Sequence, residues 1–511
     1  MKDRWKILTA VAIILSVFTG IWLVTMHVQP QNEVGAYKKI LRDQGEKLEV
    51  NEILPPPVPP ESNSVIMVQE AFRMLGSSIG SIPYGMTIVA PGKAMVAHMQ
   101  PEVCGFDFTN SWENFTAEVA GNRSAIELLH QVLERPKLDF QLEYKKGFSL
   151  LLPHLSPLKR AEQKLQAAVV CDLHNGDTGA AMTNILTMLG LVQRNEGEGL
   201  LISHLVRIAM TAITISPSWE LLQSTNVTDG QLAALQQGWE AMNFLSDATN
   251  VFVMERACSI KEIQKARASY DEVKKTFGLT TSMSPPASSS GSIWDWPPDW
   301  EAITTKPRYA IGAAMWRSSW SYSDELRTLQ GESTMLETLR TMQTNQSQFY
   351  KADYDAMTVR LSSLGITNAG ASFFRALKIP DFSEYFGGLS IVHVVRKIIS
   401  IETARRIVIT AIALKRFQLE YGKLPETLNG LVPQFLSAVL IDPYDGKLLR
   451  YRADADGTYL LYSIGEDGVD DGGSTSKFYW QGNKNRDWVW PQPAAAKEIQ
   501  TYYEEQARKS K

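Results

Sequence analysis

The sequence feature that most constrains this fold is an uncharged apolar run near the N-terminus. Residues 7–26 read ILTAVAIILSVFTGIWLVTM, and a helix needs about twenty such residues to cross the hydrocarbon core of a bilayer. The run is longer than the apolar core of a cleaved signal peptide, and residues 23–26 offer no small-x-small cleavage site. A buried helix of a soluble protein seldom runs this long without a charge. We therefore expect a transmembrane anchor at residues 7–26.

The charges beside this run predict the side of the membrane on which the body lies. Three basic residues stand within the first six positions, and apart from one histidine the next basic residue after the run is Lys38. Because basic residues are retained on the cytoplasmic side, we expect residues 1–6 to form a cytoplasmic tail. The expected location is the inner (cell) membrane, crossed once, with residues 27–511 periplasmic or otherwise extracytoplasmic.

Composition narrows the classes of function. The 511 residues are 44% hydrophobic and 21% charged, which is ordinary for a chain that folds around cores, and the length suits two to four domains. The net charge of −4 argues against a nucleic-acid partner, because such domains are usually strongly basic. Cys104, Cys171 and Cys258 lie far apart in no metal-binding spacing. We expect small buried apolar roles for them, although an oxidising compartment would allow two of them to pair.

The first half of the chain divides at a proline run. Residues 27–64 form a juxtamembrane segment that contains LPPPVPP at residues 54–60, and prolines favour extended polyproline geometry. We expect a semi-rigid spacer that holds the body off the membrane. Residues 65–280 are predicted to be a mostly helical domain of antiparallel helices joined by short turns. One helix is expected to end before Pro217, and another to begin at the capping box of Thr228 and Gln231.

The second half begins with a polar stretch, TSMSPPASSSGS at residues 281–292, which predicts a linker or surface loop. Residues 293–399 hold a tryptophan-rich segment and a second helical region. The rings of Trp294, Trp296 and Trp300 suit either a stacking platform for sugars or the packing of a loop. We favour packing, because tryptophan buries a large area and needs only one hydrogen-bond partner.

Catalytic motifs give little support to an enzyme. The seven histidines show no HExxH spacing, and the chain contains no P-loop or GxGxxG signature; residues 76–80, GSSIG, have the GxSxG spacing but are not taken as a nucleophile elbow. The nearest approach to a metal cluster is Cys171-Asp172-Leu173-His174, followed by Asp177. Because these residues stand where a helix is expected to end at an Asn-Gly turn, we interpret them as a structural turn. Catalysis is therefore uncertain, and we lean against it.

The C-terminal part of the chain carries the most specific pattern. A helical stretch over residues 400–421 ends at Gly422, which is suited to cap it. Two short strand patterns follow, joined by a hairpin turn at Asp456-Gly457. Residues 464–473, IGEDGVDDGG, then place acidic side chains among glycines. Calcium sites are built from oxygen ligands brought together in such turns; the alternative is a solvated turn without an ion.

Residues 413–473 resemble the C-terminal part of the major pseudopilin of type II secretion systems. In that family a long helix ends at a Tyr-x-x-x-Gly-x-Tyr-Pro-like element, followed by an Asp-Pro-(Trp/Tyr)-Gly-like turn, a short antiparallel sheet and a Ser-Leu-Gly-Ala-Asp-Gly calcium loop. Here YGKLP at residues 421–425, DPY at 442–444 and SIGEDG at 463–468 fall on these elements in order. The resemblance implies a calcium ion held by the carbonyl of Ile464 and by Asp467, with Asp470 and Asp471 as further ligands.

Other parts of the chain depart from that family. No Gly-Phe-Thr-Leu-x-Glu prepilin-peptidase site precedes the apolar run, so assembly into a pseudopilus through this helix is not expected. The layout as a whole resembles a set of uncharacterised membrane-anchored proteins of planctomycetes and verrucomicrobia. That resemblance implies a bacterial source and an architecture without implying an activity.

The expected architecture is mainly α: an N-terminal transmembrane helix, a body of helical hairpins, and a small α+β pseudopilin-like module at residues 400–493. A tail helix is expected at residues 494–511. The expected function is a membrane-anchored scaffold or interaction protein with partners in the cell envelope, linked to secretion or pilus-like machinery. The alternative is an exported enzyme or carbohydrate-binding protein that uses a cleft in the helical body or the tryptophan-rich segment.

Overall fold

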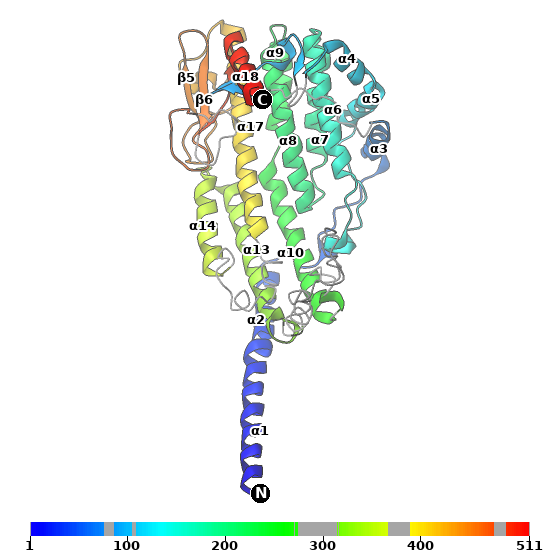
Figure 1. Ribbon diagram of the computed structural model, residues 1–511, viewed down its shortest axis with the longest axis vertical. Coiled ribbons are helices and arrows are strands. Elements are labelled where there is room, and N and C mark those ends of the chain that lie inside the picture. Colours follow the sequence, from blue (N-terminus) through cyan, green and yellow to red (C-terminus); the bar gives the residue numbers. More distant parts are fainter. Residues whose placement is uncertain are drawn as a thin grey trace, which may run out of the picture.

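The structure is a computed structural model that describes residues 2–75, 86–104, 109–269, 271–273, 314, 316–365, 389–474 and 487–509. A long stalk leads into a bundle of helices, and small sheets lie at the end of the bundle away from the stalk (Figure 1). The predicted class, mainly α with small β elements, is confirmed over the described residues. The tryptophans at 294, 296 and 300 and the predicted linker at residues 281–292 lie outside them.

The helices run mostly along one axis. The stalk and its continuation are α1 Lys2–Leu23, the π-helical turn η1 Val24–Val28 and α2 Gln29–Asp43. The α-helices of the body are α3 Val65–Met74, α4 Trp112–Ala120, α5 Arg123–His130, α6 Leu155–His174, α7 Thr178–Arg194, α8 Leu201–Leu222, α9 Asp229–Glu240, α10 Phe244–Ala268, α13 Ser321–Thr344, α14 Tyr350–Ser363, α17 Leu389–Tyr421 and α18 Ala496–Lys509. Short single turns are η2 Val50–Glu52, η3 Pro60–Ser62, η4 Ala97–Met99, η5 Gln131–Glu134, η6 Tyr144–Ser149, η7 Trp316–Trp320 and η8 Leu428–Leu431.

The described strands form three small sheets. One has the order β1-β2-β8, with β1 Thr87–Ala90 antiparallel to β2 Lys93–Met95 and β2 parallel to β8 Gln492–Pro493. The second pairs β3 Val103–Cys104 with β4 Thr109–Asn110, and the third has the order β5-β6-β7, with strands Arg450–Ala453, Tyr459–Ser463 and Trp488–Val489. Because β8 joins β2, the C-terminal end of the chain is tied to its first third.

Local sequence signals place many of these boundaries correctly. Helices α6 and α7 meet at the predicted turn, where Gly176 takes a φ of 76° that glycine adopts without a steric penalty. The capping box is present, with Thr228 accepting from the Gln231 main-chain N–H at the start of α9. The expected end before Pro217 is wrong, because α8 continues to Leu222 and buries Trp219. Packing of that last turn outweighs the disruption that proline causes in a helix.

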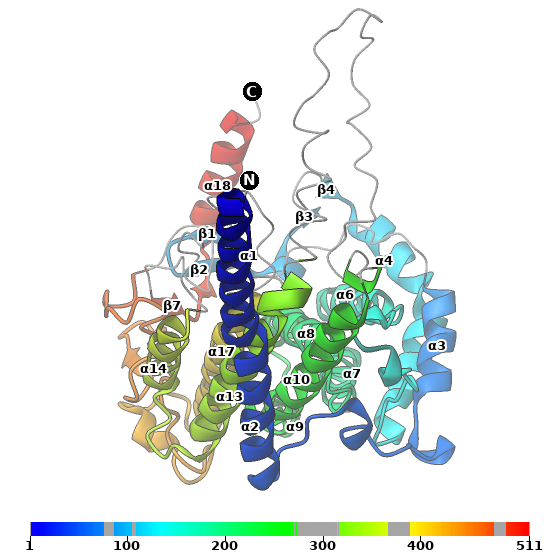
Figure 2. The ribbon, with the colours of Figure 1, turned by 90° about the horizontal axis from the view of Figure 1, so that it is seen from below.

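The proline run does not separate the body from the stalk. Helix α2 precedes it and already packs on the body, where Val34 and Leu41 are buried against Ile260 of α10 and Leu329 of α13. Residues 54–60 therefore follow a segment that belongs to the body, and the predicted spacer role is wrong. Figure 2 shows α2 lying alongside α13.

One continuous core unites the regions that the sequence divides. It extends from Val68 of α3 to Trp490, and its central helix, α17, packs against α8 and α9. The expected C-terminal module at residues 400–493 is therefore not a separate unit, because the apolar residues of its helix, such as Ile407 and Leu414, lie inside the shared core. The helix begins at Leu389, earlier than predicted.

The apolar N-terminal run forms a helix that stands away from the body (Figure 1). Its large apolar side chains point outward on several faces; Ile13 is 62% exposed and Phe18 67%. In the part of the chain that the structure describes, α8 is the helix with both the length and the apolar composition of a membrane span, and half of that apolar window is buried. Helix α8 is therefore a core helix, whereas residues Thr9–Trp22 form a shorter apolar stretch.

Candidate functional site

The C-terminal turn is organised by a fully buried aspartate. Asp442 Oδ1 accepts hydrogen bonds from the main-chain N–H of Tyr444 (3.0 Å) and the hydroxyl of Ser463 (2.8 Å). Its Oδ2 accepts from the main-chain N–H of Ile464 (3.0 Å) and from Arg450 Nη1 (3.1 Å). These four bonds fix the start of the acidic loop against the end of β6, because every contact reaches either the turn or the strand.

Arg450, on β5, supplies positive charge to the surrounding carboxylates. Its guanidinium bonds Asp442 and Asp445 and lies 3.5 Å from Asp470 Oδ2. Burial alone would raise the pKa of Asp445, but the bonds from Arg450 hold that pKa below its usual value. Arg450 therefore already supplies a positive charge to the side of the loop that faces β5.

The four predicted calcium ligands take different positions. Ile464 is buried beside Asp442, whereas Asp471 is exposed. Asp467 Oδ1 accepts from the main-chain N–H of Val469 (3.1 Å), which closes its own turn. Asp470 Oδ1 accepts from the Tyr462 hydroxyl and from the Gly472 main-chain N–H (both 3.0 Å). Among the described residues no three acidic, histidine or cysteine side chains converge on one point as metal ligands would.

A fifth residue, Asp487, belongs to this site and was missed by sequence reasoning. It is fully buried directly before β7, and its Oδ2 accepts from the main-chain N–H of Gly473 at the end of the loop (2.7 Å). Its Oδ1 is buried and makes no hydrogen bond of normal geometry with the described residues, although the main-chain N–H of Asp471 lies close enough to lower the pKa of the carboxyl. Burial, reinforced by Asp470 and Asp471, raises the pKa of Asp487. The one available signal was an aspartate directly before the apolar run Trp488-Val489-Trp490.

A cation at this loop would offset more buried negative charge at Asp487 than at Asp467. Buried carboxylate oxygens without a partner are rare in folded proteins because their desolvation is uncompensated. A cation at Asp487 Oδ1 would satisfy that atom and offset its repulsion by Asp470 and Asp471. Asp467 Oδ1 already accepts the Val469 N–H, so this carboxylate is partly satisfied without a metal.

The Cys171-to-Asp177 cluster is a structural turn in this fold. Asp177 caps α7 by accepting from the Ala180 main-chain N–H (2.8 Å), and Asp172 accepts from the Asn184 side chain (2.7 Å). His174 stacks on Trp112 with ring centroids 3.6 Å apart. Each side chain thus has a packing or capping role. Cys171 and Cys258 are free and buried, which confirms their predicted roles, whereas the side chain of Cys104 lies outside the described part of the structure.

Three histidines that sequence spacing did not single out pair with acids inside the body. The distances are 2.9 Å from His154 Nε2 to Glu198 Oε1, 2.9 Å from His204 Nδ1 to Asp247 Oδ2, and 2.6 Å from His98 Nδ1 to Glu220 Oε2. All six side chains are almost fully buried. Partners far apart in the chain leave no local motif, so this set was invisible to sequence reasoning.

The described tryptophans of the second region are packed. Trp316 is 2% exposed, donates from Nε1 to Asp324 (2.7 Å), and lies against Ile263 and Val273. The described rings therefore offer no flat sugar-binding face.

Comparisons with known proteins do not suggest a function for this chain. No known protein family, curated protein or solved structure matches the chain.

Proposed function

We propose that the chain is a single-pass, membrane-anchored scaffold or interaction protein whose body lies outside the cytoplasm. The observation that carries the proposal is α1, whose apolar side chains are exposed around an isolated stalk. Such a surface is unfavourable in water because exposed apolar area costs about 25 cal/mol per Å². A bilayer removes that cost. The basic residues before the stalk favour a cytoplasmic N-terminus at the inner (cell) membrane.

Helix α2 connects the stalk to the body and fixes their relative orientation. Lys38 pairs with the buried Glu325 of α13, which also pairs with Arg267 of α10. Glu46, after α2, pairs with Arg256 of α10 and Arg340 of α13. Each acid bridges two cations from different helices, so α2 is clamped at two levels. A scaffold needs this kind of rigid joint to present its far end at a fixed height.

The anchor is tested by fractionation. We expect the full chain to pellet with membranes and the chain lacking residues 2–26 to remain in the supernatant, because the body keeps its own core. Alkaline phosphatase fused after Lys511 is expected to be active, and a reporter that works only in the cytoplasm to be inactive. The control replaces three exposed apolar residues of other helices, Ile66, Ile202 and Val359, with serine. A soluble full chain, or the reverse reporter pattern, would contradict the anchor.

We further propose that the sheet end of the body is the contact surface for envelope partners linked to secretion or pilus-like machinery. The support is the order of elements after α17: Gly422 with a φ of 68°, the Asp442 turn, and the β5-β6 hairpin. That order matches the pseudopilin pattern named above. These strands lie at the end of the body away from α1 (Figure 1), where a partner would meet them free of the bilayer.

Calcium binding at the acidic loop is part of this proposal. Calcium is expected to raise the melting temperature of the full chain in detergent, because an ion that binds only the folded form stabilises it by mass action. Asp487→Asn is expected to remove most of that gain, and Asp467→Ala tests the ligand that the pseudopilin resemblance implies. The full chain is required, since α17 is buried in the shared core and a fragment of residues 401–493 would expose it.

Asp454→Ala is the matched control for calcium, because Asp454 is a partly exposed carboxylate before the hairpin turn and pairs with Arg452. Its calcium response is expected to equal that of the wild type. If wild-type melting is unchanged up to millimolar calcium, which covers the usual range of such sites, the loop is a solvated turn.

The alternative of an exported enzyme or carbohydrate-binding protein has less support. Four cavities lined by described residues each contain at most one carboxylate. General acid-base chemistry on a sugar needs two carboxylates on one cleft. The buried histidine-acid pairs lie inside the packed body. The scaffold is therefore the function that we propose.

A further inference from the structure

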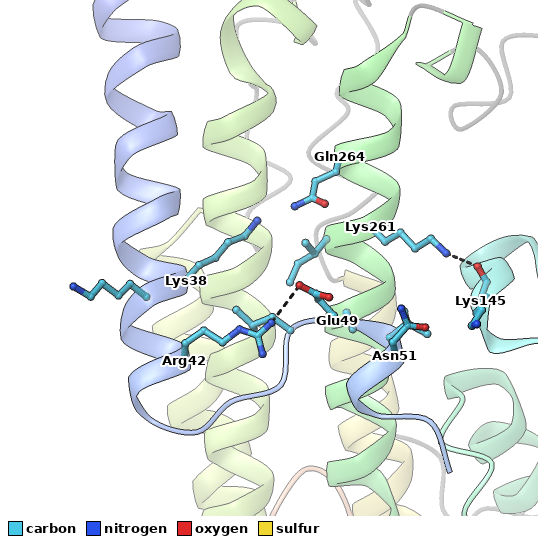
Figure 3. A pocket seen from close by; sticks show the side chains of 12 residues that line it. Lys38, Arg42, Glu49, Asn51, Lys145, Lys261 and Gln264 are labelled. Carbon is cyan, nitrogen blue, oxygen red and sulfur yellow. Dashed lines mark hydrogen bonds and ion pairs between the residues drawn. The ribbon is translucent and has the colours of Figure 1, made fainter. Parts of the chain in front are cut away.

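A cavity beside α2 collects basic side chains. Its volume is about 610 Å³, which lies within the range of small-ligand sites. It lies between α2, α10 and the segments at η2 and η6 (Figure 3). Its charged lining residues are five bases and one acid: Lys38, Lys39, Arg42, Lys145, Lys261 and Glu49. We call this site the basic cavity.

Two of these cations are already neutralised by the protein. Lys38 pairs with Glu325, and Arg42 binds both oxygens of Glu52 at 2.6 and 2.7 Å. Hydrogen bonds from Arg42 lower the pKa of Glu52 accordingly. These two residues hold α2 and the following loop in place.

The other three, Lys39, Lys145 and Lys261, have no such acid among the described residues. Lys261 instead donates to the main-chain carbonyl of Lys145, which holds the ammonium group of Lys261 at the cavity wall (Figure 3). A carbonyl oxygen accepts one N–H of the Lys261 ammonium but does not cancel its charge. In a chain with a net charge of −4, this local excess of positive charge indicates a place for an anion.

The rest of the lining sets the chemistry of that anion. The amide side chains of Asn51 and Gln264 provide uncharged hydrogen-bonding groups, and Leu48, Val50 and Ile260 form an apolar floor. Lysine ammonium groups act as compact charges toward phosphate oxygens, whereas paired recognition of a carboxylate favours a free arginine. Arg42 is occupied by Glu52. We propose that the basic cavity binds a phosphate-bearing anion through Lys145 and Lys261.

The position of the cavity distinguishes two sources of phosphate, and this step rests on the proposed anchor. Lys38 is twelve residues beyond Met26 along a continuous helical path, which places it about 18 Å past the expected end of the span. A headgroup layer roughly 5–8 Å thick does not extend that far. A soluble or polymeric phosphate of the envelope is therefore the expected occupant, and a lipid headgroup is the other outcome of the test.

The test uses tripolyphosphate as the probe and the full chain in nanodiscs of neutral phosphatidylcholine, with binding measured by titration calorimetry. Wild type is expected to bind, more weakly as salt is added. The double variant Lys145→Gln/Lys261→Gln is expected to bind about tenfold more weakly, with an unchanged melting temperature. The matched control, Lys159→Gln/Lys423→Gln, removes two exposed lysines from other helices and loops and is expected to bind like wild type.

A second arm separates the sources. The measurement is repeated in nanodiscs that contain anionic phosphatidylglycerol. If this lipid weakens tripolyphosphate binding to wild type more than binding to the control variant, the lipid headgroup competes for the site and is identified as the occupant. The same affinity in both nanodiscs identifies a soluble phosphate. Absence of tripolyphosphate binding, or an equal loss in both double variants, overturns the proposal. If the proposed membrane anchor is wrong, tripolyphosphate binding can still be measured by calorimetry on the protein in plain buffer. Failure of the anchor proposal and failure of the phosphate proposal are therefore distinguishable.

Discussion

Glu332→Gln is expected to raise the free energy of unfolding by roughly 3–5 kcal/mol at pH 8 and to leave it nearly unchanged at pH 4. Glu332 lies between α13 and α10, where it is 2% exposed. Its Oε1 accepts from the Ser259 hydroxyl (2.7 Å), and its Oε2 is buried without a partner among the described residues. Burial, with a further contribution from Glu255, raises the pKa of Glu332 to about 8.

The direction of this pH dependence follows from the number of protons bound in the folded and unfolded states. Between the ordinary pKa of 4.5 and the folded value of about 8, the folded chain keeps a proton that the unfolded chain has released. Raising the pH through this window therefore destabilises the fold. Glutamine resembles the protonated acid and does not titrate, so the variant avoids the loss. Glu402 has the opposite dependence, because Arg405 and Arg406 outweigh its burial and lower its pKa to about 2, so its stabilisation is lost progressively as the pH falls from 4.5 to about 2.

Chemical denaturation of the full chain in detergent at pH 4, 6 and 8 measures this difference. Glu337→Gln is the control, because Glu337 lies on the same helix, is 56% exposed and pairs with Arg360. Its effect on the unfolding free energy is expected to stay within about 0.5 kcal/mol at each pH. A loss of stability in Glu332→Gln at every pH would show that Glu332 is charged and paired in the folded protein.

Asp442→Ala is expected to lower the free energy of unfolding by about 3–5 kcal/mol. The change removes the acceptor for two main-chain N–H groups, the Ser463 hydroxyl and Arg450 at once. Hydrogen bonds to a charged group contribute about 1.5–3 kcal/mol each, and donors left buried without a partner add a desolvation cost. Arg450 also loses a buried counter-charge. Denaturation and the rate of proteolysis near residue 464 measure the effect.

Asp454→Ala serves again as the comparison, since Asp454 makes one ion pair, at the surface, with Arg452. Surface pairs of this kind contribute about 0–1 kcal/mol. The conservative change Asp442→Asn keeps an acceptor oxygen and is expected to fall between wild type and alanine. Equal losses in Asp442→Ala and Asp454→Ala would mean that the turn is held by the core beneath it rather than by Asp442.

Features whose causes lie within a few residues could be predicted from the sequence. The apolar periodicity of α6, the capping box at Thr228, the glycine end of α17 at Gly422 and the hairpin at Asp456-Gly457 all stand in the structure. The cap and the turns depend on a local hydrogen bond or on the φ preference of one residue, and the periodicity of α6 is a pattern within one short segment, so each can be recognised without knowing a distant partner. The mainly helical class follows from the same short-range signals.

Which segments share a core and which polar groups meet became known from the three-dimensional packing alone. It placed α2 on the body, merged the C-terminal module with the central bundle through α17, and carried α8 through Pro217. It also brought Asp487 to the acidic loop and Lys145 to Lys261. Residues that meet in these contacts can lie more than a hundred positions apart, and the free energy of burying them depends on every neighbour in the packed body. No window of sequence contains that information.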